Sequence, residues 1–280
     1  MILRLRDTTL DLATPRVMGV LNVTPDSFSD GGRFATRDAA LAQARAMVEQ
    51  GAGLLDIGGE STRPGARAVS EQEELDRVLP VIEALRGETP VPLSIDTMKP
   101  AVMRAALAAG AAMINDVNAL QGSGAVEAVR AAGAAVCLMH MQGEPRTMQA
   151  NPVYGDVVRE VAAFLAARAA ACEKAGIARD AIVIDPGFGF GKRLEHNLAL
   201  LGRLDALTTL GYPVLVGLSR KSMFGQIVGA GVGERLPAGL AAAAMAVGKG
   251  AGIVRTHDVA ATRDAVRVAH AIREAGTEQR

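Results

Sequence analysis

Aromatic residues are scarce in this chain of 280 residues: they make up 3% of it, and tryptophan is absent. No charge of one sign predominates either, because 30 basic residues balance 30 acidic ones. Proteins that bind single-stranded nucleic acid stack bases on aromatic side chains and line their grooves with positive charge. The composition therefore gives no support to a broad nucleic-acid-binding surface.

Cysteine is also rare, and Cys137 and Cys172 form neither a CxxC pair nor a disulfide framework. Two buried apolar thiols in a reducing compartment are the expectation. The first ten residues carry charges inside any apolar run, which argues against a signal peptide. The alanine-rich segment 238–248 is too short to span a membrane and predicts an ordinary helix. We expect a cytoplasmic protein.

What the chain does contain is a repeated alternation of short apolar runs and longer helical patterns. The apolar runs lie at 17–21, 54–57, 92–95, 112–114, 135–139, 181–184, 213–218 and 252–254. The clearest helical patterns lie at 37–50, 71–86, 100–109, 155–175 and 259–274. Runs that are apolar on both faces suit a buried parallel sheet, and eight of them can close into a barrel.

These features predict a (β/α)8 TIM barrel in a single domain over 1–280. An open, doubly wound sheet is the structural alternative, but it usually has fewer strands, and no strand–GxGxxG–helix motif is present. The segments after the first two strands, 22–36 and 58–70, are long and rich in Gly, Pro, Ser, Thr and Asp. In a barrel they emerge on the face that carries active sites, which makes them candidate lids.

Polar residues follow the predicted strands at equivalent places. They are Asn22, Asp96, Asn115, Asp185, Lys221, Arg255 and His257. Any one of them could be a helix cap or a turn former. Seven at the same end of a barrel instead indicate a binding site.

The residue types suggest a ligand. Asp96 and Asp185 can accept paired N–H bonds from an amidine-like heterocycle, Asn115 can donate and accept, and Lys221 supplies a cation. An amino-oxo-pyrimidine ring such as a pterin fits this set.

Arg255 and His257 follow the last strand, in a region where barrels often bind phosphate, and a guanidinium pairs well with phosphate oxygens. Asn22 could add an oxygen ligand to a Mg²⁺ ion held mainly by phosphate and water. His257 as a purely structural histidine is the alternative.

The glycine-rich segment 185–192 resembles a P-loop but does not match the P-loop sequence motif. Its spacing is one residue short of GxxxxGK, and Arg193 occupies the Ser or Thr position. A glycine loop that lets a ligand approach closely is the better interpretation. We expect His140 only to form hydrogen bonds in the barrel rim. The spacing of the histidines does not predict a zinc site. The GxSxG motif of a serine nucleophile is absent from the sequence.

Several motifs, in this order, resemble the dihydropteroate synthase family over about 16–260. They are LNVTPDSFSDGG at 21–32, ESTRPG at 60–65, SIDT at 94–97, IND at 114–116, DPGFGF at 185–190, SRKS at 219–222 and RTHD at 255–258. The resemblance implies a transferase of folate biosynthesis and a sulfonamide target. It would join 6-hydroxymethyl-7,8-dihydropterin diphosphate to 4-aminobenzoate with release of diphosphate.

The resemblance also implies roles for individual residues. The pterin would be held by Asp96, Asn115, Met139, Asp185 and Lys221, and the diphosphate by Asn22, Arg255 and His257, with Asn22 also binding Mg²⁺. The 4-aminobenzoate pocket would include Phe28, Thr62, Pro64, Phe190, Lys221 and Ser222. Asp30, Arg63 and Lys221 would be catalytic. A homodimer is implied as well.

Two other functions remain open at this point. A corrinoid-linked methyltransferase would share the pterin-binding Asp and Asn residues but should lack the SRKS and TRPG motifs. A barrel that binds a pterin without catalysis should have lost a loop motif or Arg255. The sequence retains all of these features.

Overall fold

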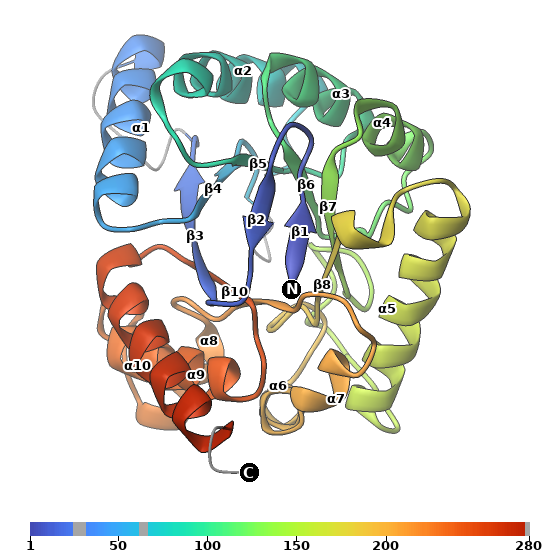
Figure 1. Cartoon of the computed structure of the whole chain (residues 1–280), viewed down its shortest axis with the longest axis vertical. Coiled ribbons are helices and arrows are strands. Elements are labelled where there is room, and N and C mark those ends of the chain that lie inside the picture. Colours follow the sequence, from blue (N-terminus) through green and yellow to red (C-terminus); the bar gives the residue numbers. More distant parts are fainter. Residues whose placement is uncertain (25–31, 62–66, 278–280) are drawn as a thin grey trace.

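The computed structural model describes residues 1–24, 32–61 and 67–277, with 32–36 and 277 described in backbone only. Parallel strands form its centre and helices surround them (Figure 1). The strands are β3 (Arg16–Asn22), β4 (Leu54–Gly58), β5 (Leu93–Asp96), β6 (Met113–Asp116), β7 (Ala135–Met139), β8 (Ile182–Asp185), β9 (Leu215–Gly217) and β10 (Ile253–Thr256). All eight predicted strands are present.

The sheet closes on itself. Its strand order is β8-β7-β6-β5-β4-β3-β10-β9, with parallel pairing throughout, and a bridge from Ile184 to Val214 brings the two end strands together. Closure removes the sheet edges, as the run of eight units predicted. The predicted (β/α)8 barrel is therefore confirmed, and the open-sheet alternative is excluded.

Helices cover the outside of the barrel. They are α1 (Gly32–Glu49), α2 (Glu71–Glu88), α3 (Pro100–Ala109), α4 (Ala125–Ala132), α5 (Val157–Lys174), α6 (Leu194–Gly202), α7 (Asp205–Thr208), α8 (Ser222–Val228), α9 (Leu236–Gly248) and α10 (Val259–Thr277), with short 3-10 turns η2 (Arg179–Ala181) and η3 (Val232–Glu234). None of the helices described is long and apolar enough to cross a membrane.

Local sequence explains several helix ends. The Ser70 side chain accepts a hydrogen bond from the Glu73 amide at the start of α2, and Asp156 caps α5 in the same way. Pro100 begins α3, where its missing N–H costs nothing. Gly110 ends α3 with φ at 128°, a conformation that favours glycine.

Some expectations need correction. Helix α1 begins at Gly32, five residues before the predicted start, and strand β9 is shorter than the predicted run 213–218. An N-terminal hairpin, β1 (Ile2–Arg4) with β2 (Thr9–Asp11), was not predicted. Its leucines are buried and it contacts η2, which precedes β8, so the hairpin covers the N-terminal ends of the strands (Figure 1). The active-site face is the opposite one.

Candidate active site

The structure brings together the polar residues at the carboxyl ends of the strands. Neighbouring strands pair Asn22 with Gly58, Gly58 with Asp96, and Asp96 with Asn115. Met139 pairs with Asp185 in the same way. These residues therefore follow one another around the rim, because parallel strands in register bring their last residues to the same level.

A buried charge network connects both sides of this rim. The Arg255 guanidinium donates from Nε to Asp56 Oδ2 at 2.6 Å and from Nη2 to Asp96 Oδ2 at 2.8 Å. Asn115 Nδ2 donates to the same Asp56 oxygen at 2.9 Å. Asp56 thus orients both the guanidinium and the amide, and Arg255 links the expected diphosphate residues to the expected pterin residues.

Asp56 is the functional residue that the strand-end argument missed. It lies inside β4 rather than at its end, and it is fully buried. A buried carboxylate is costly unless it is paired, so its place in the apolar run Leu54-Leu55-Asp56-Ile57 was a usable signal. Its Oδ1 has no hydrogen-bond partner among the residues described.

Burial also alters the acidity of the site. It raises the pKa of Asp96 to about 7, against the attraction of Arg255, and the nearby Asp56 carboxylate raises it further. Burial raises the pKa of Asp185 to about 6, although the Gly187 amide and the cations Lys221, Lys192 and Arg255 oppose the shift. Both carboxyl groups therefore change charge close to neutral pH.

Lys221 lies at the start of α8, beside the glycine loop that follows β8. Its ammonium is 4.4 Å from the centre of the Phe190 ring, and its aliphatic chain runs close to Gly189. Arg220 has a left-handed backbone, with φ at 59°, and its side chain pairs with Asp258 at 2.9 Å. That ion pair fixes the turn that presents Lys221, and Ser222 follows it in an exposed position.

His257 is held by the same group of loops. Its Nδ1 lies 3.0 Å from Ser219 Oγ, which also accepts from the His257 amide. Met139 is buried and Asn22 is half-buried. The remaining expected residues, Phe28, Asp30, Thr62, Arg63 and Pro64, lie outside the described part of the chain.

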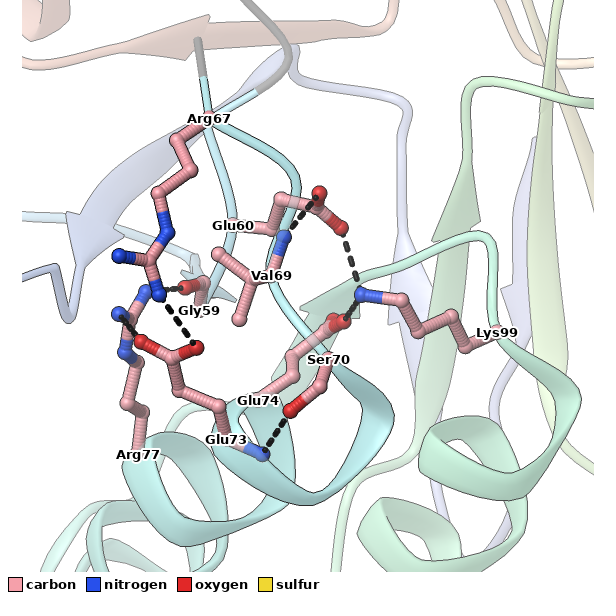
Figure 2. A network of polar contacts seen from close by, with 9 residues as sticks. All are labelled: Gly59, Glu60, Arg67, Val69, Ser70, Glu73, Glu74, Arg77 and Lys99. Carbon is pink, nitrogen blue, oxygen red and sulfur yellow. Dashed lines mark hydrogen bonds and ion pairs between the residues drawn. The ribbon is translucent and has the colours of Figure 1, made fainter.

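The described base of the second long loop is held by a separate polar network (Figure 2). Lys99 Nζ bonds Glu60 Oε2 at 2.6 Å and Glu74 Oε2 at 2.5 Å, and Glu60 Oε1 accepts from the Val69 amide at 3.0 Å. Arg77 donates to the Gly59 carbonyl at 2.7 Å. Contacts to α2 and to Lys99 therefore fix the chain on both sides of the segment 62–66.

Comparison with known proteins shows the family to which the chain belongs. Residues 18–257 match the pterin binding enzyme family. The dihydropteroate synthase of Escherichia coli K12 is 50% identical over 98% of this chain and 97% of its own. These matches show that the chain belongs to the pterin binding enzymes and, among them, to the dihydropteroate synthase family.

Solved structures agree as well. A Yersinia pestis dihydropteroate synthase in a sulfonamide drug complex superposes with a TM-score of 0.93 at 51% identity, over 98% of this chain and 100% of that one. A Xanthomonas albilineans dihydropteroate synthase in complex with 7,8-dihydropteroate gives 0.88 at 50% identity, over 97% and 98%. Similarity over nearly the full length of both chains favours a synthase over the methyltransferase alternative.

Proposed function

We propose that this enzyme condenses 6-hydroxymethyl-7,8-dihydropterin diphosphate with 4-aminobenzoate, releasing 7,8-dihydropteroate and diphosphate in folate biosynthesis. The observation that carries the proposal is the network of Asp56, Asp96, Asn115 and Arg255 at the mouth of the barrel. The structural relative that binds 7,8-dihydropteroate supports the same product.

The pterin ring would lie against the buried rim. Asp96 and Asp185 would accept its N–H groups, Asn115 would donate and accept, and Lys221 would donate to a ring oxygen or nitrogen. Met139 would supply an apolar surface beneath the ring. This pocket is fixed before substrate arrives, because Asp56 holds Asn115 and the Gly187 amide holds Asp185 at 2.7 Å.

Asn22, Arg255 and His257 would bind the diphosphate. The side-chain oxygen of Asn22 lies beside Gly58, close to Asp96, and an amide oxygen suits Mg²⁺ held mainly by phosphate and water. Bound there, Mg²⁺ would neutralise negative charge on the diphosphate. The described residues contain no group of three or more His, Cys, Asp and Glu that could hold a metal by themselves.

The reaction is a substitution at the pterin methylene carbon. The C–O bond breaks, its electron pair leaves with diphosphate, and the reduced ring donates electron density to the carbon. The amine of 4-aminobenzoate then forms the C–N bond and loses a proton. Arg255 and His257 would stabilise the departing charge, and no covalent enzyme intermediate is involved.

The amine would arrive over the glycine loop. Phe190, Lys221 and Ser222 would form that side of its pocket, and the family resemblance adds Phe28, Thr62 and Pro64, with Asp30 and Arg63 as catalytic loop residues. Positioning and exclusion of water carry the catalysis. A sulfonamide would compete for the same place, and the Yersinia pestis relative was solved in complex with such a drug.

We also propose a homodimer that works in the cytoplasm. Met245 on α9 and Val268 and Ile272 on α10 are large apolar side chains that are more than half exposed, and the two helices pack against each other. A second copy would cover them.

Cys137 and Cys172 are free and buried, as predicted, and suit a reducing compartment.

A single assay tests the proposed activity. Diphosphate release is measured with the pterin substrate, with and without 4-aminobenzoate and Mg²⁺, and the products are separated by chromatography. We expect a product that depends on the amine and release that depends on Mg²⁺. The proposal fails if no amine-dependent product forms.

A further inference from the structure

Lys192 belongs to the glycine-rich segment that imitates a P-loop, yet its ammonium points into the protein. The side chain is buried, and Nζ has four acceptors within reach. These are the carbonyl oxygens of Gly187 at 2.9 Å, Phe190 at 3.0 Å and His140 at 3.2 Å, and His140 Nδ1 at 3.0 Å. An ammonium has three N–H donors, so it is fully used here and is turned away from any phosphate.

The contacts of Lys192 join two neighbouring strand ends. His140 directly follows β7, whereas Gly187 and Phe190 belong to the loop after β8. Gly187 and Gly191 have left-handed backbones, with φ at 68° and 61°, and a Cβ at either would overlap a carbonyl oxygen of the segment after β7. The two segments therefore touch backbone to backbone, and Lys192 bonds them at the contact.

His140 is suited to accept from Lys192. Burial and the adjacent Lys192 charge lower the pKa of His140 to about 3, so the imidazole is neutral at working pH. Its ring packs edge-on against Phe164, with centroids 4.9 Å apart. The acceptor is thus both uncharged and fixed in place.

The loop that Lys192 holds carries two groups of the active site. The Gly187 amide donates to Asp185 Oδ1 at 2.7 Å, and the Phe190 ring lies under the Lys221 ammonium at 4.4 Å. Lys192 bonds the carbonyl oxygens of the same two residues. A change at Lys192 should therefore reach the pterin carboxylate and the aminobenzoate side together.

We propose that Lys192 is a positioning residue of the condensation, whose buried ammonium fixes the glycine loop and so sets Asp185 and the Phe190–Lys221 pair. This role rests on the proposed function for its kinetic part only. Burial lowers the pKa of Lys192 to about 7, so the side chain is charged below that pH, where it favours the ionised form of Asp185 together with Lys221 and Arg255. Of the other titratable groups nearby, His140 is neutral, and burial raises the pKa of the Cys137 thiol, which leaves that group neutral as well.

Two variants separate charge from hydrogen bonding. Lys192→Met removes the donors and the charge, whereas Lys192→Gln removes the charge and keeps two of the three N–H donors. Tyr154→Phe is the matched control, since it deletes a hydrogen bond from the Tyr154 hydroxyl to the Gly191 carbonyl at 2.8 Å without touching a charge. The readouts are pterin binding by calorimetry from pH 5 to 8, kcat, and KM for 4-aminobenzoate.

Pterin affinity should fall at low pH, and we call this fall the acid limb. In both Lys192 variants the acid limb should move to a higher pH by about half a unit or more, because Asp185 loses a stabilising cation. Lys192→Met should also lower kcat by about 10- to 100-fold and raise KM for 4-aminobenzoate, since the loop loses its fixed geometry. Tyr154→Phe should leave the acid limb where it is.

The positioning role is overturned if folded Lys192→Met and Lys192→Gln bind pterin with the wild-type acid limb. If neither Lys192 variant folds, Lys192 serves stability alone, and the positioning role is overturned as well. Pterin binding is read without turnover, so absence of an amine-dependent product in the wild type would reject the proposed activity without deciding the role of Lys192.

Discussion

Asp56 shows how a single buried carboxylate organises the mouth of this barrel. Its Oδ2 accepts from both Arg255 and Asn115, so one atom sets the direction of a cation and of an amide. Asp96 shares Arg255 and is thereby tied to the same unit. At the scale of the residue, the site consists of charges that hold one another in place before a ligand arrives.

Lys221→Ala should lose pterin affinity and rate together. The ammonium is proposed to donate to the pterin, and a hydrogen bond to a charged group contributes about 1.5–3 kcal/mol, so affinity should fall by about 10- to 150-fold. Calorimetry and steady-state kinetics measure the two effects. Lys174→Ala, at an exposed lysine of α5, is the control. Unchanged pterin binding in Lys221→Ala would count against the assigned role.

Pterin binding should weaken as pH falls through about 7 and then 6. Ionised Asp96 and Asp185 offer both carboxylate oxygens to N–H donors, whereas a protonated carboxyl is uncharged and carries a hydrogen on one oxygen. Their pKa values in the free protein are about 7 and about 6. Each lost ionisation lowers the affinity, so the dependence should steepen below pH 6. Calorimetry in two buffers of different ionisation enthalpy should also detect proton release on binding near pH 6.5. Affinity that stays constant from pH 5 to 8 would contradict this assignment.

At the scale of the element, the network beneath the second loop combines a helix cap with buried ion pairs (Figure 2). Ser70 caps α2, and the first turn of that helix supplies Glu73 and Glu74. Burial opposes the charge on Lys99, but its hydrogen bonds to Glu60 and Glu74 raise the pKa of Lys99 above its usual value. The described ends of the loop are therefore fixed by the same element that follows it.

Lys99→Met should destabilise the protein by about 3–5 kcal/mol, because it leaves the buried Glu74 carboxylate without its cation. Urea denaturation measures the change. The double variant Lys99→Met/Glu74→Met should recover most of that stability, since an apolar pair can replace a buried ion pair. It should still show a raised KM for 4-aminobenzoate, because Glu60 has lost its link to α3. Wild-type stability in the single variant would show that the ion pair contributes little.

At the scale of the whole molecule, one end of the barrel is closed and the other carries chemistry. The hairpin β1–β2 covers the N-terminal ends of the strands with buried leucines, which leaves the carboxyl ends for the substrates (Figure 1). In the proposed homodimer, the outer helices α9 and α10 form the contact between the two copies. Val268 and Ile272 are one helical turn apart on α10 and both face solvent.

Ile272→Asp should weaken the proposed dimer by roughly 10-fold or more, because a charge would have to be buried at the interface. Sedimentation equilibrium measures the dissociation constant. Leu198→Asp, on the exposed side of α6, should leave association unchanged. A wild-type chain that sediments as a monomer at micromolar concentration would reject the dimer outright.

The sequence determined the barrel by itself, because strand-length apolar runs followed by helical patterns allow few other arrangements. It also indicated seven rim residues, since the carboxyl ends of parallel strands must share one face. The N-terminal hairpin escaped prediction because its strands have three residues each, too few for an apolar alternation to stand out.

Only the tertiary structure decided how the rim residues are connected. Distances between Asp56, Asp96 and Arg255 depend on the pairing of the last strand, β10, with the first barrel strand, β3, and on the curvature that lets Arg255 reach β4 and β5. The sequence likewise gave no indication of the direction of the Lys192 side chain, since it predicted only a glycine loop that lets a ligand approach closely. Its burial against His140 follows from the packing of two loops, and spacing along a chain carries no record of that contact.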